Sequence, residues 1–509
     1  MNRNKALLVL ILLTSFSLSA CSGKPGGVVC PPAGCVVGGG GGTFFVTMVA
    51  DTLPPNPSIL TFRVTITGIA LITAAGAQQA LPLNGSPVVD LMRLQSDTAF
   101  LGTFTNIPAG QYTGVVVSFS NPVLTFFNDT ANTLQGCPPN TVCTQFNPVT
   151  SAAPQTNVNF SVSSTNATGI GLELELAHIA IISGNNLTVN FANPQVLFAF
   201  ALPRPQFFLP AGQLDLIEDF TGVVSISNAN ATITSATATS RGAITATATT
   251  NTIFNADPTG NLCKNPSLGV LTSCVANNQA ASMDVILKTD GTISIQEIEP
   301  LLATLKDTVE GIVVSINPAN STQFTMVVTD LIPAATNSLI GSLKIGDGLI
   351  VNLAANPTFN VDTKGLSVLP GVLSNFAGQT TTTAIFPGQS VAVHVSAFTA
   401  ATANAFASAN NTETVTLRWS RFTATPKTAA TPAFSITALP SYFGFTQASF
   451  FNVQTTTGTP GTLGVTNFDG VSDTGSLNTG RPVALRALFL ENPGLTANPA
   501  FTAAKIRQH

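Results

Sequence analysis

Residues 60–66 read LTFRVTI, and this short stretch decides the class of fold. Apolar side chains at its even positions alternate with Thr and Arg at its odd positions, the period-two pattern of a strand with one buried face. The same alternation recurs in YTGVVVSF (112–119) and in LELELA (172–177). Turn residues interrupt these runs about every ten residues, and no long run has the period of a helix. The sequence therefore predicts an all-β chain of sandwiches or small barrels.

The chain is too long for one core, since 509 residues exceed the roughly 250–300 at which single cores stop growing. We expect a first β-sandwich domain over 44–203. A break follows in the proline-rich stretch LPRPQFFLP (202–210), because proline has no amide proton to give to a ladder.

An internal repeat begins after this break. FTGVVSISNANATIT (220–234) and VEGIVVSINPANSTQFTMVV (309–328) share a Gly-hydrophobic-Val-Ser-Ile pattern, and GQSVAVHV (388–395) and GRPVALRA (480–487) share G-x-x-V-A. The two members of each pair lie about ninety residues apart. These echoes predict three related β units over 210–302, 306–424 and 433–509, with a proline-containing linker at 424–433 between the last two.

The first twenty residues are typical of a secretion signal. Arg3 and Lys5 precede the apolar stretch 6–13, which is too short to span a membrane, and small residues follow it. The sequence Leu-Ser-Ala-Cys at 18–21 resembles the bacterial lipobox, which implies a signal peptide over 1–20 and acylation of Cys21. A Gly/Pro-rich tether over 21–43 would hold the body off the membrane. An ordinary secretory peptide with an incidental cysteine is the alternative.

The residue after Cys21 is Ser22, and we expect the outer membrane, on its periplasmic face or at the cell surface, as the location. Only 8% of the residues are charged and the net charge is -4, far from the basic surface that nucleic acid requires. The expected partners are the membrane, through the lipid, and glycans or other envelope components.

Six cysteines remain after Cys21 is assigned to lipid. They form three close couples, which are Cys30 with Cys35, Cys137 with Cys143, and Cys263 with Cys274. Six thiols allow fifteen pairings, and the short spacings favour one local disulfide in each couple over zinc ligation or free thiols.

Three motifs in the first domain carry a family resemblance. ILTFRVTITGIAL (59–71), PVVDLMRL (87–94) and FTNIPAGQYTGVVVSFS (104–120) resemble, in this order, the bacterial domain-of-unknown-function family 4382, which implies a prealbumin-like sandwich. The later repeats are similar to a second uncharacterised family of OB-like barrels, through the Gly-Asp-hydrophobic element at Gly346 and Asp347. Neither resemblance implies an activity.

Candidates for catalysis are few. His178 is predicted at a strand end near a core face, and His394 on the strand face opposite its valine neighbours. Glu173 and Glu175 are expected side by side on one strand face, where solvent contact is a commoner role than the paired acids of a glycosidase. No motif places a nucleophile beside either histidine. We therefore expect no enzyme and no cofactor.

Four further residues are weaker candidates. Asp90 and Tyr112 lie in the family motifs, where each is expected to anchor a turn, with ligand contact as the alternative. Asp469 and Asp473 could bind calcium through oxygen ligands, although their spacing is typical of an ordinary turn. The sequence thus favours a structural or binding lipoprotein. The alternatives are glycan or surface-ligand recognition by loops of the sandwich and, third, a hydrolase.

Overall fold

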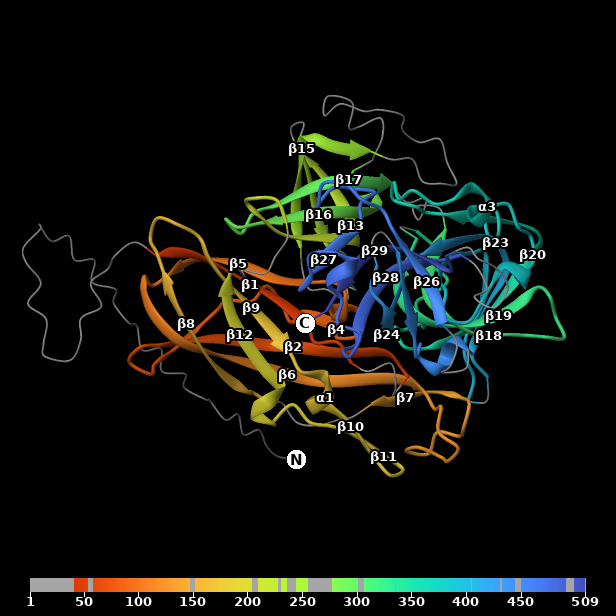
Figure 1. Ribbon diagram of the computed structural model, residues 1–509, viewed down its shortest axis with the longest axis horizontal. Coiled ribbons are helices and arrows are strands. Elements are labelled where there is room, and N and C mark those ends of the chain that lie inside the picture. The colour runs from red at the N-terminus through yellow and green to blue at the C-terminus, as the bar shows by residue number, and fades with distance from the viewer. Residues whose placement is uncertain are drawn as a thin grey trace, which may run out of the picture. The chain divides into compact units, whose positions relative to one another are not determined.

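The computed structural model describes residues 41–508 apart from several short segments. The undescribed residues within this span are 54–57, 147–151, 204–208, 228–229, 236–243, 255–276, 301–305, 335, 404, 431–432, 445–449 and 491–498. The fold is all-β, as predicted (Figure 1). The described helices are single turns, which are α1 (Leu176–Ile179), α3 (Pro370–Leu373), η1 (Arg93–Gln95), η2 (Pro194–Val196), η5 (Thr382–Ala384), η6 (Ser441–Phe443) and η7 (Thr474–Ser476).

The first domain contains two main sheets, drawn in red to yellow in Figure 1. One has the order β12-β9-β1-β5, with β1 (Gly42–Ala50), β5 (Ala99–Ile107), β9 (Thr168–Leu174) and β12 (Leu197–Leu202). The other contains β2 (Ile59–Thr73), β3 (Gln78–Ala80), β4 (Val88–Asp90), β6 (Gly110–Phe127), β7 (Val142–Phe146) and β8 (Gln155–Val162). A separate hairpin pairs β10 (Ala180–Ser183) with β11 (Asn186–Val189).

The predicted alternation places the core of this sandwich correctly. Phe62, Val64 and Ile66 of β2 are fully buried in one cluster with residues of β1, β6 and β9. Leu60 is the exception, because the register of β2 shifts between Ile59 and Thr61. The shift places Leu60 in a different cluster, which is formed mainly by residues after 420.

Three barrels follow the sandwich, and each has five strands in the same pairing order. The first strand pairs with the second and the fourth, the fourth pairs with the fifth, and the third and fifth close the barrel in parallel. This is an OB-like arrangement. The first barrel contains β13 (Gln213–Ser227), β14 (Asn230–Ser235), β15 (Thr245–Phe254), β16 (Ala280–Lys288) and β17 (Ile293–Pro300).

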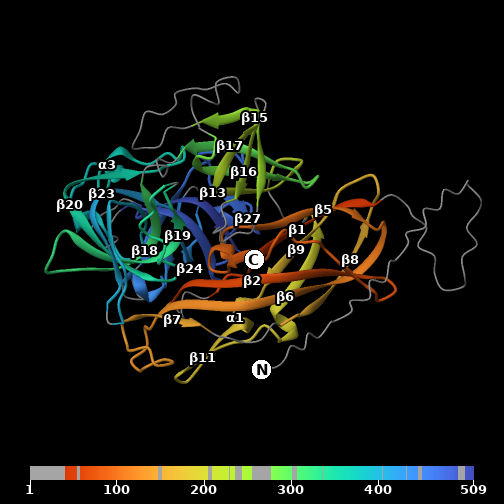
Figure 2. The same cartoon turned by 180° about the vertical axis from the view of Figure 1, so that it is seen from behind.

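The second and third barrels repeat this plan (Figure 2). The second contains β18 (Asp307–Ile316), β19 (Gln323–Ile332), β20 (Gly348–Val361), β21 (Ser390–Val395) and β23 (Ala407–Arg418), with β22 (Ala397–Thr399) added beside β23. The third contains β24 (Ser420–Thr428), β25 (Ala433–Thr437), β26 (Phe450–Thr455), β28 (Val483–Phe489) and β29 (Phe501–Arg507), with β27 (Asn467–Asp469) added beside β29.

The sequence echoes occupy equivalent places in these barrels. Gly222 and Gly311 lie in the first strands β13 and β18, while Gly388 and Gly480 precede the fourth strands β21 and β28. The structure has no linker at 424–433, contrary to the prediction, because β24 and β25 pair there as a hairpin. The second barrel ends at Arg418 and the third begins at Ser420.

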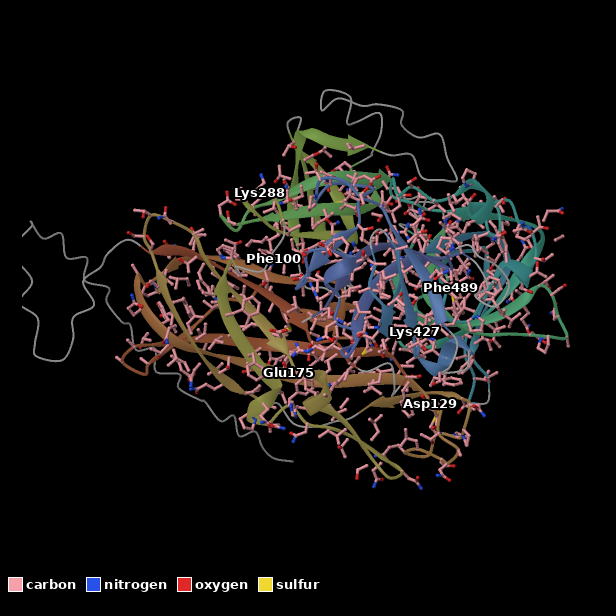
Figure 3. The ribbon with its side chains drawn as sticks, in the orientation of Figure 1. Phe100, Asp129, Glu175, Lys288, Lys427 and Phe489 are labelled. Carbon is pink, nitrogen blue, oxygen red and sulfur yellow. A yellow bond between two sulfur atoms is a disulfide. The ribbon has the colours of Figure 1, made fainter. Side chains whose placement is uncertain are left out.

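The sandwich and the three barrels each have an apolar cluster of their own, but a few residues cross from one domain into the cluster of another. Residues 40–509 form one compact unit. Phe45 and Phe100 of the sandwich belong to the apolar cluster of the first barrel. Figure 3 shows Phe100 near the strands of that barrel. Leu488 of the third barrel packs in the cluster of the second. Each unit thus has its own cluster, and these crossing residues join neighbouring units.

Gly388 is a point of close approach between the second and third barrels. It has a φ of +92°, and a Cβ atom there would lie 2.2 Å from the ring of Phe443. We predict that Gly388→Ala lowers the free energy of unfolding by about 2 kcal/mol more than Gly444→Ala does. Gly444 is a matched control, since its φ is +75° but open space surrounds it. Denaturant titration of both variants measures the difference, and equal losses would contradict this role for the contact.

Candidate functional site

The segment 91–98, which follows Asp90, is the centre of a cluster of charged groups. It contains η1, and every residue from Arg93 to Thr98 is buried. Its backbone carbonyls need partners, because water does not reach them. Arg507 of the third barrel binds these carbonyls, while side chains of the segment contact Asp215 of the first barrel and Glu310 of the second. We call the segment the plug, since it lies at the junction of all four domains.

Arg507 of β29 binds the backbone of this plug. Its Nη1 donates to the carbonyl oxygens of Leu94 at 2.8 Å and Asp97 at 2.9 Å. Its Nε donates to Asp469 Oδ2 at 2.6 Å. Burial alone would lower the pKa of Arg507, but Asp469 and Asp215 outweigh burial and hold that pKa above its usual value. Arg507 therefore remains charged in the interior.

Two further arginines of the third barrel neutralise the carboxylate of the plug. Arg486 Nη1 donates to Asp97 Oδ1 at 2.7 Å, and Arg421 Nε donates to Asp97 Oδ2 at 2.8 Å. The side chains of Asp97 and Arg486 are both fully buried. Removing one partner of such a pair leaves the other charge uncompensated in a medium of low dielectric constant.

The first barrel is attached through Asp215 of β13. Its Oδ1 accepts a hydrogen bond of 2.8 Å from Lys505 Nζ, and its Oδ2 accepts one from the hydroxyl of Thr98 in the plug. Burial lowers the pKa of Lys505, whereas Asp215 opposes this effect. Asp215 thus links the first barrel to both the third barrel and the sandwich.

The second barrel receives the other end of the plug. Arg93 lies 3.6 Å from Glu310 Oε1 of β18 and 3.6 Å from Asp330 Oδ2 of β19. A cavity of about 20 Å³ lies beside it, lined also by Asp90 and Arg421. This volume holds about one water molecule, so the cavity is not a substrate site.

A second ionic cluster joins the first and second barrels. Lys364 Nζ donates to Glu299 Oε2 at 2.7 Å, and Lys364 lies 4.0 Å from Glu297 Oε2. Arg418 Nη1 donates to Asp362 Oδ2 at 2.6 Å. The two oxygens of Glu297 have no hydrogen-bond partner among the described residues. Burial, followed by the neighbouring carboxylates, raises the pKa of Glu297 to about 9, although Lys364 opposes the rise.

The two motif residues of the sandwich have structural contacts. Asp90 Oδ1 accepts hydrogen bonds from the backbone N–H of Phe62 at 2.9 Å and of Met92 at 3.1 Å. The Tyr112 hydroxyl donates to the Pro108 carbonyl at 2.8 Å, which is the turn-anchoring contact predicted from the sequence. Burial raises the pKa of both Asp90 and Tyr112.

The weak calcium candidates also have other partners. Asp469 is paired with Arg507, and Asp473 caps η7 by accepting a hydrogen bond from Ser476 N at 2.9 Å. No group of three possible metal-ligating side chains occurs among the residues that the structure describes. Asp473 therefore has the turn role, whereas Asp469 is an ion-pair partner of the junction.

The predicted acidic pair is not side by side on one strand. Glu173 lies in β9, but Glu175 lies beyond its end and precedes α1, which contains His178. The structure adds Asp51, which hydrogen bonds to Glu175, and burial, Asp51 and Glu173 raise the pKa of Glu175 to about 7. His394 lies half-buried on β21, opposite the buried valines, as predicted. The two histidines thus lie on different domains.

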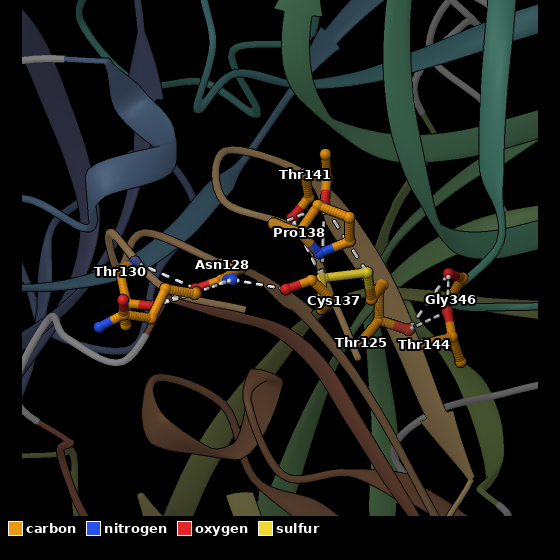
Figure 4. The surroundings of a disulfide bond; sticks show 10 residues. Thr125, Asn128, Thr130, Cys137, Pro138, Thr141, Thr144 and Gly346 are labelled. Atoms are coloured by element: carbon orange, nitrogen blue, oxygen red, sulfur yellow. Dashed lines mark hydrogen bonds between the residues drawn. A yellow bond between two sulfur atoms is a disulfide. The ribbon is translucent and has the colours of Figure 1, made fainter. Parts of the chain in front are cut away.

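One of the three cysteine couples lies in the described part of the chain, and it is bonded. Cys137 and Cys143 form a disulfide that closes the loop before β7 (Figure 4). Thr125 and Thr144, from β6 and β7, both donate to the carbonyl of Gly346 in the second barrel. Cys21, Cys30, Cys35, Cys263 and Cys274 lie outside the described residues.

Comparison of the chain with protein-family models and with curated proteins finds no match. Within the described part of the chain, no helix has the length and the apolar character needed to cross a membrane. Sequence reasoning missed the ionic junction. The available signal was the small number of charged residues, 19 basic and 23 acidic. In the described part of the chain, 16 of these charged residues are buried.

We predict that Asp97→Asn lowers the free energy of unfolding by about 3–5 kcal/mol, because it removes the buried carboxylate that pairs with Arg486 and Arg421. Glu413→Gln is the control, since it breaks the exposed pair with Lys306 and should leave the melting temperature nearly unchanged. Calorimetry of both variants tests the difference. Similar melting temperatures for Asp97→Asn and the parent protein would contradict a stabilising junction.

A second prediction concerns pH. The pKa of Glu297 rises from 4.5 to about 9 on folding, so the folded state binds its proton more tightly and loses stability as pH increases from about 5 to 9. Glu297→Gln should therefore retain more of its melting temperature at pH 9 than the parent protein does, with little difference at pH 5. Melting curves across this range test the effect. Parallel pH profiles would show that Glu297 is ionised in the folded protein.

Proposed function

We propose that this chain is a membrane-anchored, non-enzymatic lipoprotein of the bacterial envelope or surface, with a structural or binding role. The observation that carries the proposal is the use of the ionic side chains. Arg507 binds Asp469 and the plug, Arg486 binds Asp97, and Lys505 binds Asp215. Groups that could do chemistry thus hold domains together instead. Domains that are joined by buried ion pairs in this way suit a structural protein or a binding protein.

The signal-like start and the lipobox support the anchor. Each methylene of a buried acyl chain contributes about 0.8 kcal/mol to membrane binding, so two or three chains hold a protein almost permanently. We also propose that residues 44–203 belong to the domain-of-unknown-function family 4382. In support, Asp90 and Tyr112, from its most recognisable motifs, make turn contacts inside the sandwich.

The anchor predicts that the mature chain begins at an acylated Cys21. Mass spectrometry of the N-terminal peptide from the native host should show the lipid mass on that residue. Cys21→Ala should move the protein from the membrane to the soluble fraction without changing its melting temperature, and Cys30→Ala should leave it in the membrane. An unacylated N-terminus at another residue would overturn the anchoring proposal.

A further inference from the structure

A row of neutral amide side chains crosses the outer face of the second barrel. Asn317 Nδ2 donates to Gln323 Oε1 at 2.6 Å, and Gln323 Nε2 donates to Asn352 Oδ1 at 2.8 Å. Asn352 Nδ2 donates to Asn410 Oδ1 at 2.8 Å, and Asn410 Nδ2 donates to Thr399 Oγ1 at 3.1 Å. These five residues, which we call the amide row, follow one direction across β19, β20, β23 and β22. Each bond polarises the next, so the row is pre-ordered.

The middle of the amide row has hydrogen-bonding capacity left over. A primary amide has two N–H groups and two acceptor lone pairs, and the row uses one of each at Gln323 and at Asn352. Both side chains are half-buried and therefore reachable from solvent. Neighbouring strands lie about 4.8 Å apart, so one donor and one acceptor recur at about that spacing.

An exposed aromatic ring lies on the same face. Phe406 is 45% exposed, and a Cβ atom on Gly348 would lie 2.8 Å from its ring. Gly348, Ile350 and Asn352 have the same parity on β20, while Leu349 and Val351 between them are buried. The ring and the amide row therefore share the outer face and lie about 13 Å apart along the strand.

The outer face between the ring and the row is neutral. Its outward positions between the ring and the row carry no charge, since Ile350 pairs with Thr325 on one side and Ser408 on the other. A phosphate or carboxylate ligand would find no cation there. A sugar presents hydroxyls that both donate and accept, which suits amides, and an apolar C–H face, which suits a ring.

We propose that the amide row and Phe406 form a binding face for a neutral oligosaccharide. This inference deepens the binding role proposed above and does not depend on the anchor. It places glycan recognition on the second barrel, whereas the sequence suggested the loops of the sandwich. The span from ring to row gives room for more than one sugar unit.

The test is affinity electrophoresis of the full-length Cys21→Ala chain. This variant removes the proposed lipid site, so failure of sugar binding and failure of anchoring remain separate results. The gels contain hydroxyethylcellulose, xylan or galactomannan as neutral polysaccharides, with polygalacturonate and a thymidine oligonucleotide as charged comparisons. We expect retardation by at least one neutral polysaccharide and by neither charged polymer.

Two variants locate the site. Phe406→Ala and Asn352→Leu should each weaken binding by about tenfold, as truncation of a central contact does, while the melting temperature stays near that of the parent. The controls are Phe198→Ala, which removes a 48% exposed ring from the sandwich, and Asn356→Leu, which changes an exposed amide farther along β20. Both controls should bind normally.

Three results would overturn the proposal. One is the absence of retardation by every neutral polysaccharide, and another is retardation by the charged polymers alone. The third is binding that Phe406→Ala and Asn352→Leu leave intact, or that Phe198→Ala weakens equally, since the ligand would then contact another surface.

Discussion

The guanidinium of Arg507 is the group that joins the sandwich to the first and third barrels. A buried loop has carbonyl oxygens that no strand pairing satisfies. The planar guanidinium group of arginine has five N–H donors and can bind several of these oxygens together. Lysine has three donors on a single nitrogen, so it could not bind Asp469 as well as the two carbonyl oxygens. One side chain from the last strand of the chain thus completes the hydrogen bonding of a segment near its beginning. This contact holds the N-terminal sandwich against the C-terminal barrel.

The three similar barrels differ in the sign of the charges on their equivalent strands. The first barrel presents an ion-paired acid, Glu299 on β17, while the third presents bases, Lys505 and Arg507 on the equivalent strand β29. Apolar faces of similar barrels could pack interchangeably, but burying a charge against the wrong neighbour costs several kcal/mol. The ion pairs therefore select one arrangement.

The sequence predicted what depends on local pattern. Period-two alternation located β2, β6 and β9, and the repeated glycine motifs fell on equivalent strands of the barrels. The prediction of a linker was wrong because proline is tolerated in this hairpin. Pro426 lies beside a register shift, where β24 pairs with β25 but no longer with β28, so its missing amide proton costs no regular ladder bond. The junction could not be predicted, since Asp97 and Arg486 are 389 residues apart. The amide row was hidden for another reason, since asparagine and glutamine are ordinary surface residues until pairing aligns them.

The closed barrels have a consequence for a protein that carries so little charge. Most proteins stay dispersed partly through electrostatic repulsion, and this one has a net charge of only -4, with 16 of its charged groups buried. Strand-rich proteins join edge to edge when backbone groups at a sheet margin are unpaired. Here the parallel pairing of β15 with β17, β20 with β23 and β26 with β29 leaves the barrels no such margin along those strands. Ring closure therefore removes one route to self-association from the barrels, a task that surface charge performs elsewhere.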